Sequence, residues 1–426
     1  MFTIESGCYV LYNTYHRDRL NESQAIIRMK TVYVDNAATT AMCPEAINAM
    51  VDCMSSAYGN ASSLHHIGQE AAEVLFAARQ DVADCLNADV NEIYFTSGGT
   101  EADNWAIRNA ARLGSRKNKN HIISTAFEHH AVLHTLKKLE KEGFEVTYLD
   151  VSADGYVTAE QVRNAIKEET CLVTIMYANN EIGTVQPVKE IGQVCREKGV
   201  LFHTDAVQAV GHIKIDVVEQ NIDMLSLSGH KFHGPKGVGA LYCKKGISLM
   251  GIMQGGAQEK NKRPGTENIP ALSGMAAALK KACAELDKNS AYISSLRDKI
   301  IDGILPIVPR SRLNGGRDAR LPGNVSFCFE GIEGESLLLY LDLKGICGSS
   351  GSACTSGSLD PSHVLLALGL PHEIAHGSLR ISLSEYNTVE EADYIIEELP
   401  KVVNRLRDMS PVWERIMKEE SENGLQ

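Results

Sequence analysis

The sequence predicts an α/β protein with a mostly parallel β-sheet covered by helices on both faces, followed by a smaller α+β unit. Short apolar segments alternate along the chain with segments whose apolar residues recur at helical spacing. The short segments are largely apolar throughout, as is typical of strands that are buried on both faces of a sheet. The 426 residues exceed what one hydrophobic core usually organises, so we expect two domains.

The predicted elements of the first domain follow in a regular order. A strand is predicted over residues 32–35, a helix over 69–86, and another helix beginning at Glu101. Seven further strands are predicted over residues 92–96, 121–125, 145–149, 171–177, 201–205, 224–228 and 239–243. We therefore expect a large domain over residues 31–262, preceded by an extension of residues 1–30 without a clear element.

Residues 263–426 are predicted to form the smaller C-terminal domain together with connecting helices. Its predicted elements are a helical region over 269–304, a strand over 324–329, helices over 334–343 and 361–368, a strand over 378–383 and a helix over 389–406. Within it, the Gly- and Ser-rich composition of residues 347–358 favours mobility.

Composition argues against several classes of protein. No run of 18 apolar residues is present, so we expect no membrane-spanning helix, and the first residues do not resemble a signal peptide. The net charge is −12 with dispersed Lys and Arg, which argues against nucleic acid as a direct partner. The eleven cysteines contain no C-x-x-C pair, so we expect reduced thiols and a cytoplasmic protein. Cys85, Cys171 and Cys283 lie in apolar periodic segments and are expected to be inert core residues.

Residues 226–237 bring two serines, two histidines, two lysines and three glycines to the end of a predicted strand. Lys231 is nearer the strand end than Lys236 and is the natural candidate for a Schiff base with pyridoxal phosphate (PLP). A lysine in that role must be partly shielded, so that its amine loses its proton near neutral pH. The alternative is a surface lysine in a Gly/Pro turn.

Two other strand ends are candidates for holding the same cofactor. Gly98, Gly99 and Thr100 lead from a strand into a helix, where free backbone N–H groups form an anion site suited to a phosphate. A tight turn with Thr100 as helix N-cap is the alternative. Asp205 ends a buried strand, where its carboxylate could bond to the pyridine nitrogen, and Gln208 could reach the phenolic oxygen. For Asp205 alone, a helix N-cap is the alternative.

Three polar residues follow predicted strands or lie in loops. His129 could stack on the cofactor ring and move protons, although a lone histidine is more often a core or surface residue. Asn180 could contact the phenolic oxygen or the substrate, and Thr266 could contact a phosphate. For both of these, an ordinary polar turn is the alternative.

Cys354 lies in a segment of small polar residues, 349–358. Such surroundings predict an exposed thiol on a flexible loop, able to move between a buried site and the surface. The alternative is an incidental surface thiol. Arg380 lies on a predicted strand, where its guanidinium could bind a substrate carboxylate through two hydrogen bonds. The alternative for Arg380 is a salt bridge with a neighbouring side chain.

Jointly, these motifs identify a family. Over about residues 32–415 the chain resembles the group I cysteine desulfurases of the NifS/IscS type, which belong to the class V aminotransferase family of fold-type I PLP enzymes. The motifs that carry the resemblance are residues 33–40, 96–101, 128–129, 179–183, Asp205 with Gln208, 228–231, 263–266 and 349–358. Residues 384–387 and the tail after Trp413 differ from the housekeeping members, which leaves the sulfur acceptor open.

The resemblance implies a seven-stranded sheet in the large domain and a residue role for each motif. PLP would be linked to Lys231, with Gly99, Thr100, Ser228 and His230 holding its phosphate and Thr266 reaching it from the second subunit of a homodimer. His129 would stack on the ring, Asp205 would bind the pyridine nitrogen, Gln208 and Asn180 would lie near the phenolic oxygen, and Arg380 would bind the substrate carboxylate.

The resemblance also implies a reaction. Lys231 would remove the Cα proton of L-cysteine, and Cys354 would take the sulfur as a persulfide, leaving L-alanine. The acceptor would be an iron–sulfur scaffold protein of the NifU/IscU type, with Cys354 as a transient ligand of a shared cluster. Selenocysteine lyase, another activity of this fold and a non-catalytic scaffold remain as alternatives.

Overall fold

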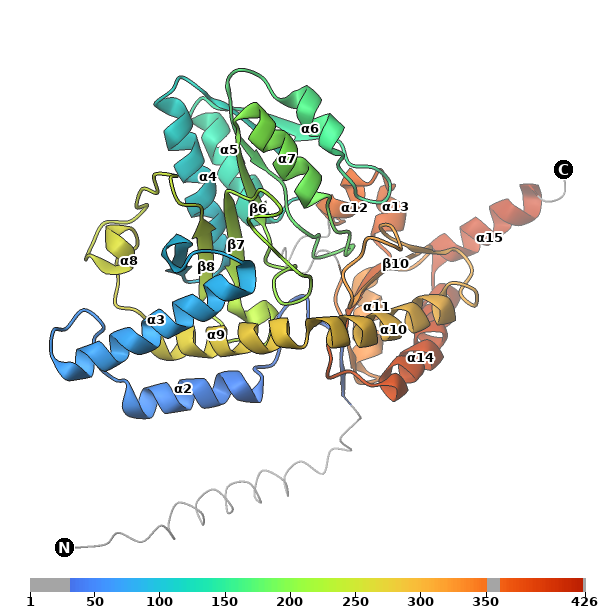
Figure 1. Ribbon diagram of the computed structural model, residues 1–426. Coiled ribbons are helices and arrows are strands. Elements are labelled where there is room, and N and C mark those ends of the chain that lie inside the picture. The colour runs from blue at the N-terminus through green and yellow to red at the C-terminus, as the bar shows by residue number, and fades with distance from the viewer. Residues whose placement is uncertain (1–30, 351–360, 424–426) are drawn as a thin grey trace, which may run out of the picture.

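The computed structural model describes residues 31–350 and 361–423 (Figure 1). The segment that contains Cys354 and the extension of residues 1–30 lie outside the described residues. At the centre is a seven-stranded sheet in the order β2-β8-β7-β6-β5-β3-β4. Its strands are β2 (Ile93–Thr96), β3 (His121–Thr125), β4 (Glu145–Leu149), β5 (Thr170–Thr174), β6 (Leu201–Asp205), β7 (Met224–Ser228) and β8 (Gly239–Cys243).

The sheet is mostly parallel, as predicted. Strands β4, β3, β5, β6 and β7 are parallel, and β8 is antiparallel to both of its neighbours, β7 and β2. Successive residues of the buried strands point to opposite faces: Ile123 and Val173 belong to one core cluster, and Ile122 and Leu172 to another. Two buried faces explain why these strands are apolar throughout rather than at alternate positions.

Helices cover both faces of this sheet. They are α2 (Pro44–Ser56), α3 (His66–Leu86), α4 (Gly99–Ser115), α5 (His130–Lys141), α6 (Ala159–Ala165), α7 (Val188–Lys198), α8 (Gln258–Asn261) and α9 (Ile269–Ala284), with short 3-10 turns η1 (Val90–Glu92) and η2 (Gly229–Lys231). Helices α4 and α5 share one core cluster with the sheet, whereas α3, α7 and α9 share the other. Helix α2 was not predicted: its exposed face carries apolar side chains such as Met54, which weakens the helical periodicity.

The smaller C-terminal unit is built on an antiparallel sheet in the order β12-β10-β9. Its elements are α10 (Leu286–Ile304), β9 (Ser311–Leu313), β10 (Asn324–Phe329), α11 (Gly334–Asp342), β11 (Ile346–Cys347), α12 (His363–Ala367), α13 (His372–Ala375), β12 (Ser378–Ser382), α14 (Val389–Asp408) and α15 (Pro411–Asn423). The predicted helical region 269–304 is two helices, α9 and α10, that meet at Glu285 and lie nearly end to end (Figure 1).

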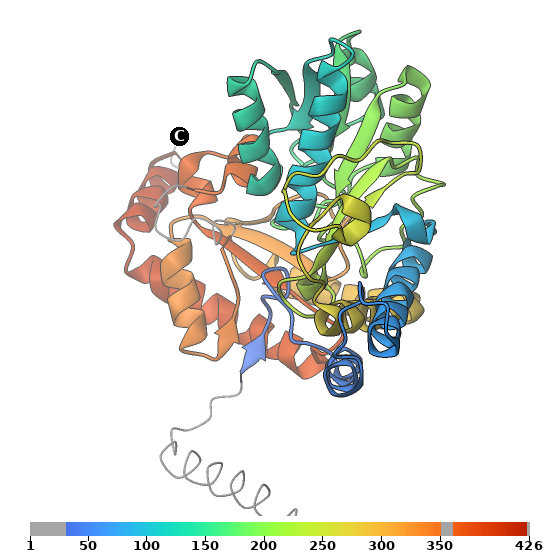
Figure 2. The same ribbon diagram turned by 90° about the vertical axis from the view of Figure 1, so that its left-hand side faces the viewer.

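The beginning of the described chain joins the C-terminal unit. Strand β1 (Val32–Tyr33) pairs in parallel with β11, and Val32 and Val34 belong to the core of the C-terminal unit (Figure 2). The chain then crosses to the large sheet through residues 35–43. The domain boundary at residue 262 stays a prediction, and these first residues contact both units. Among the described helices, none is long and apolar enough to cross a membrane.

A buried ion pair fixes α3 to the loop that follows the sheet. Arg79 on α3 donates to both carboxylate oxygens of Glu259 at 2.6 Å, and its guanidinium lies 4.4 Å from the ring centroid of Phe95. Glu259 also accepts from the backbone N–H of Phe95 at 3.0 Å. Both partners of the pair are buried, so the loss of one leaves the other charge without compensation.

We therefore expect Arg79→Met to lower the free energy of unfolding by about 3 kcal/mol, because it strands the buried Glu259 carboxylate. The midpoint of urea unfolding measures this effect. Lys189→Met is the control, because it breaks the exposed Lys189–Glu219 pair and should leave the midpoint unchanged. Equal midpoints for the wild type and Arg79→Met would contradict the expectation.

Candidate active site

The candidate residues gather at one edge of the large sheet. Strands β3, β5, β6 and β7 are parallel and end at the same edge, and β2 runs in the same direction because β8 is antiparallel to both β7 and β2. The loops after these strands carry His129, Asn180, Asp205, Lys231 and the Gly98–Gly99 turn. Ligands of open α/β sheets bind at this carboxyl edge.

Lys231 lies in the 3-10 turn η2, directly after β7. Its Nζ donates hydrogen bonds to the carbonyl oxygens of Ala37 at 2.6 Å and Ala38 at 2.9 Å. The side chain is half-buried rather than on the surface, which gives the partial shielding that a Schiff-base lysine needs. Its backbone carbonyl accepts a hydrogen bond from His212 Nε2 at 2.9 Å, which fixes the turn.

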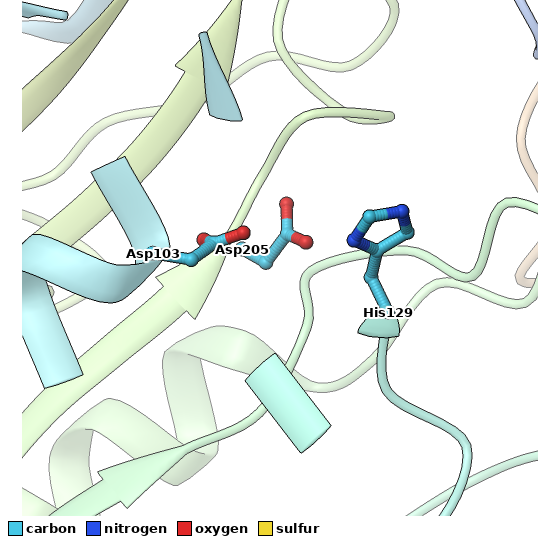
Figure 3. A group of neighbouring side chains, drawn as sticks. All are labelled: Asp103, His129 and Asp205. Carbon is cyan, nitrogen blue, oxygen red and sulfur yellow. The ribbon is translucent and has the colours of Figure 1, made fainter. Parts of the chain in front are cut away.

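Two buried carboxylates and an imidazole lie together beside this turn (Figure 3). One carboxylate oxygen each of Asp103 and Asp205 and one ring nitrogen of His129 all lie within 4.8 Å of one another. In the view of Figure 3, Asp205 is between the other two. Asp205 ends β6, and its Oδ1 accepts from the N–H of Val207 at 3.0 Å. The predicted alternative for Asp205, a helix N-cap, is wrong, because a turn and no helix follows β6.

Burial dominates the protonation of the two carboxyl groups. It raises the pKa of Asp103 well above its usual value, and the neighbouring Asp205 raises that pKa further. Burial also raises the pKa of Asp205, but His129 and Lys231 oppose this rise. Two carboxylates this close do not both ionise readily in a buried site. The proton therefore belongs on Asp103, and the negative charge on Asp205.

His129 is held in one tautomer. It is the N-cap of α5, and its Nδ1 accepts a hydrogen bond from the N–H of Ala131 at 3.1 Å. Because Nδ1 is an acceptor, the ring proton of the neutral imidazole lies on Nε2. Burial lowers the pKa of His129, with the Asp205 carboxylate acting in the opposite direction.

The neighbouring Glu128 fixes the position of His129 from inside the protein. Its Oε1 accepts from Thr125 Oγ1 at 2.8 Å and from the N–H of Met176 at 2.9 Å, so it joins the ends of β3 and β5. Its Oε2 is buried and has no hydrogen-bond partner among the described residues. Burial raises the pKa of Glu128 to about 8, so the side chain is protonated at neutral pH.

The turn after β2 forms a cradle of backbone N–H groups. Helix α4 begins at Gly99, and its N-cap is Gly98 rather than Thr100, so the predicted alternative of a Thr100 cap is wrong. A Cβ on Gly99 would lie 2.5 Å from Val207 Cγ2, and one on Gly98 would lie 3.5 Å from Ser228 Oγ. Side chains would therefore fill the space in which the first N–H groups of α4 are open to an anion.

His230, in the turn after β7, is the candidate that would hold the phosphate together with this cradle. Its Nδ1 lies 3.2 Å from Thr39 Oγ1. Burial, together with the charges of Lys231 and Lys236, lowers the pKa of His230 to about 4. The neutral ring can still donate one hydrogen bond to a phosphate, as Ser228 Oγ can.

Arg380 on β12 extends from the C-terminal unit into the site. Its Nη2 lies 2.9 Å from Asp35 Oδ1, and its Nη1 donates to the carbonyl of Asn180 at 3.2 Å. Its Nε is buried and has no hydrogen-bond partner in the described parts of the chain. The predicted alternative, a salt bridge with a neighbour, is therefore present, while one donor of the fork remains for a substrate.

Residues 35–38 join these groups into one pocket. Asp35 binds Arg380, and two residues later Ala37 accepts both from Lys231 Nζ and from Gln208 Nε2, the latter at 3.0 Å. The candidate carboxylate-binding arginine and the candidate Schiff-base lysine are therefore held by neighbouring residues of a single turn.

Thr266 is exposed and lines a cavity of about 110 Å³ with Ser97 and Gly237. Its loop is fixed by Arg263, whose guanidinium donates to both carboxylate oxygens of Glu101 in the first turn of α4.

Both ends of the segment that carries Cys354 are anchored at the site. Before it, Ser349 exchanges backbone hydrogen bonds with Arg380, at 3.1 and 2.6 Å. After it, the Ser362 hydroxyl donates to the buried carboxylate of Glu181, next to Asn180. Ser362 is also the N-cap of α12. Burial raises the pKa of Glu181 to about 7.

Three residues of the site were missed in the sequence. Asp103 and Glu181 stand among other polar residues in the sequence, and Glu128 adjoins the more conspicuous His129. A signal was present for Asp103: it lies on the buried face of α4, where the other buried residues except Asn109 are apolar or glycine and a buried carboxyl group is unusual.

The donor set fits PLP, a flat pyridine with a phosphate. The cradle at Gly98 and Gly99 offers open N–H groups and no side chains, as a phosphate requires. The buried Asp205 carboxylate suits a protonated pyridine nitrogen, and Asp103 Oδ1 is buried without a hydrogen-bond partner among the described residues. The neutral His129 ring is available for stacking.

Comparisons with known proteins agree with this geometry. Residues 32–395 match the family described as Aminotransferase class-V. The chain is 53% identical over 395 residues to the cysteine desulfurase IscS of Clostridium botulinum (strain Hall), covering 92% of this chain and 99% of the relative. It is 53% identical to the cysteine desulfurase IscS of Methanosarcina thermophila over 90% of this chain and 94% of that one. A solved NifS-like protein superposes with a TM-score of 0.83 at 37% identity, over 88% of this chain and all of that one.

The raised pKa of Glu128 predicts a pH-dependent stability. A carboxyl group with a pKa of about 8 in the folded state and an ordinary value of 4.5 stabilises the fold below pH 4.5, and this contribution is lost as the pH rises towards 8. A glutamine does not titrate, so Glu128→Gln should not lose this contribution. We expect its free energy of unfolding at pH 7 to exceed that of the wild type by on the order of 3 kcal/mol.

Urea unfolding of both proteins at pH 5 and pH 8 measures the difference. The exposed variant Glu140→Gln is the control and should follow the wild type at both values. If the free energies of unfolding of Glu128→Gln and the wild type became more similar as the pH rises, the raised pKa of Glu128 would be contradicted.

Proposed function

We propose how the residues of this site divide the work, starting from the premise that the chain belongs to the class V aminotransferase family and is a PLP-dependent cysteine desulfurase. The reaction converts L-cysteine to L-alanine and leaves the sulfur on an enzyme cysteine. The observation that carries the assignment is the turn of residues 35–38, which holds Lys231 and Arg380 at one pocket beside the buried Asp205. PLP, when bound, supplies an electron sink for the charge that develops at the substrate Cα.

The cofactor-holding roles follow the positions of the donors. Lys231 would provide the covalent link, and the backbone of Gly99 and Thr100, together with Ser228 and His230, would hold the phosphate. Gln208 and Asn180 would hold the phenolic oxygen. Thr266 acts across the interface of a homodimer, which accounts for its exposed place in one protomer.

Asp205 and His129 set the electrostatics of the pocket. Asp205 would hold the pyridine nitrogen with its negative charge, because burial and Asp205 itself keep the neighbouring Asp103 protonated. His129, neutral with its proton on Nε2, would stack on the ring without adding a second positive charge and can pass a proton within the site.

Arg380 orients the substrate. Its buried Nε and the Nη2 that faces Asp35 can form a fork to the substrate carboxylate. Asp35 is partly exposed and can turn towards solvent when the substrate carboxylate replaces it. With the carboxylate fixed, the Lys231 amine is the base that removes the Cα proton and later returns a proton.

Cys354 receives the sulfur. Its thiolate attacks the substrate sulfur, the bond between that sulfur and Cβ breaks, and Cβ takes up a proton, so the products are L-alanine and a Cys354 persulfide. Cys354 follows Ser350 by four residues, a chain length that spans at most about 14 Å. Because Ser349 is bonded to the backbone of Arg380, this tether starts beside the substrate carboxylate site.

The partners follow from membership of the family. We infer a homodimer, with an iron–sulfur scaffold protein of the NifU/IscU type as sulfur acceptor and Cys354 as a transient ligand of a shared cluster. A reducing compartment, the cytoplasm, suits the free thiols of the described cysteines.

Replacement of Cys354 by Ala tests the sulfur-transfer step. We expect the variant to retain the yellow cofactor and the binding of cysteine, and to lose sulfide release from cysteine in the presence of a thiol reductant by at least about a hundredfold. Cys347→Ala is the matched control, since Cys347 is a partly exposed thiol in the same region. Sulfide release by Cys354→Ala at the rate of the control would rule out Cys354 as the acceptor.

Replacement of Arg380 by Lys tests substrate orientation. A lysine keeps the charge but loses the fork, so the KM for L-cysteine should rise roughly 10- to 100-fold, with kcat changed less. Steady-state alanine production measures both constants. Arg297→Lys, at another buried arginine away from the site, should leave them unchanged. A fall in kcat at constant KM would assign Arg380 a different role.

A further inference from the structure

Two cysteines outside the site form a contacting pair. Cys85 lies in the last turn of α3 and Cys283 in the last turn of α9, and these two helices pack against each other. Both pack against the main core, as predicted, but each is partly exposed, whereas Cys171 is buried; their inertness stays a prediction. A side-chain hydrogen bond joins Cys85 and Cys283, and both residues line the same cavity.

The pair opens into a cavity of about 520 Å³ on the side of α3 and α9. The cavity lies between the end of α3, the loop after β6 and the beginning of α10. Its lining carries charges of both signs, from Asp84, Lys214, Asp216, Asp287 and Lys288. A lining of this kind suits a small zwitterion, such as an amino acid, better than an apolar ligand or a simple anion.

A metal ion explains the pair less well than a redox reaction between the two thiols. In residues 31–350 and 361–423, the group of three metal-ligating side chains with close donor atoms is Asp103, His129 and Asp205, in the active site. Cys85 and Cys283 thus lack a third ligand among the described residues. Two hydrogen-bonded thiols in the wall of one cavity are instead placed for disulfide formation.

We propose that Cys85 and Cys283 form a reversible disulfide by exchange with a small zwitterionic disulfide of the cystine type, the oxidised form of the substrate. The Cys283 thiolate attacks one sulfur of cystine and displaces one cysteine, which leaves a mixed disulfide. The Cys85 sulfur then attacks Cys283, and the second cysteine leaves. Two electrons pass from the thiol pair to cystine, and the two thiol protons end on the two cysteine products.

The hydrogen bond sets the order of these steps. It lowers the pKa of Cys283, whereas the same bond and burial raise the pKa of Cys85. The thiolate is the attacking species in exchange, so Cys283 reacts first and Cys85 closes the disulfide. The bond would tie α3 to α9 next to the junction at Glu285, where α10 leads into the C-terminal unit.

Peptide mapping of the holoenzyme tests this proposal. The reduced full-length protein is incubated with cystine, its free thiols are alkylated, and it is digested with trypsin without reduction. Cys85 and Cys283 fall in tryptic peptides 80–108 and 282–288, each of which contains a single cysteine. We expect these two peptides to be linked, with a loss of two free thiols per chain that dithiothreitol reverses.

Matched variants decide the outcome. Cys85→Ser and Cys283→Ser should each abolish the linked peptide, and the buried control Cys171→Ser should retain it. The link should also form in Cys354→Ala, which excludes exchange through the catalytic thiol. The oxidised protein should melt higher, because the cross-link closes about two hundred residues of the unfolded chain. Unlinked peptides, a mixed disulfide that persists at Cys283, or a link that needs Cys354 would each overturn the proposal.

Discussion

The site depends on one constraint, the parallel pairing of β3, β5, β6 and β7. Parallel strands end at the same edge, so the residues that follow them meet although they are far apart in the sequence. The pairing also fixes which face each side chain occupies, since a shift by one residue would reverse inward and outward positions. Asp205 faces His129 and Lys231 because β6 is held in register between β5 and β7.

Burying carboxyl groups at that edge has an electrostatic consequence. Asp103, Glu128 and Glu181 are buried, and burial raises the pKa of each. Asp103 and Glu128 are protonated at neutral pH and act as supports, while Asp205, beside Lys231 and His129, keeps the charge. The proposed cofactor pocket would thus present the Asp205 charge without the repulsion of these two neighbouring carboxyl groups.

The sequence predicted the sheet better than the helices around it. All seven strands of the large sheet lie where apolar segments predicted them, because burial on two faces leaves an unambiguous pattern. Helix α2 was missed because its outer face is apolar, and the division at Glu285 was missed because apolar spacing continues across it. Motif residues such as Lys231 and Asp205 stand out at strand ends, whereas the contact of Asp103 with Asp205 depends on how α4 packs on β6 and β7.

The two ends of the Cys354 segment show how the C-terminal unit serves the chemistry. Ser349 is bonded to the backbone of the residue whose side chain faces the substrate, and Ser362 is bonded to Glu181, next to Asn180. One anchor therefore belongs to the small sheet and the other to the large one. The two ends of the segment are therefore fixed to both units, at the two places that supply Arg380 and Asn180 to the pocket.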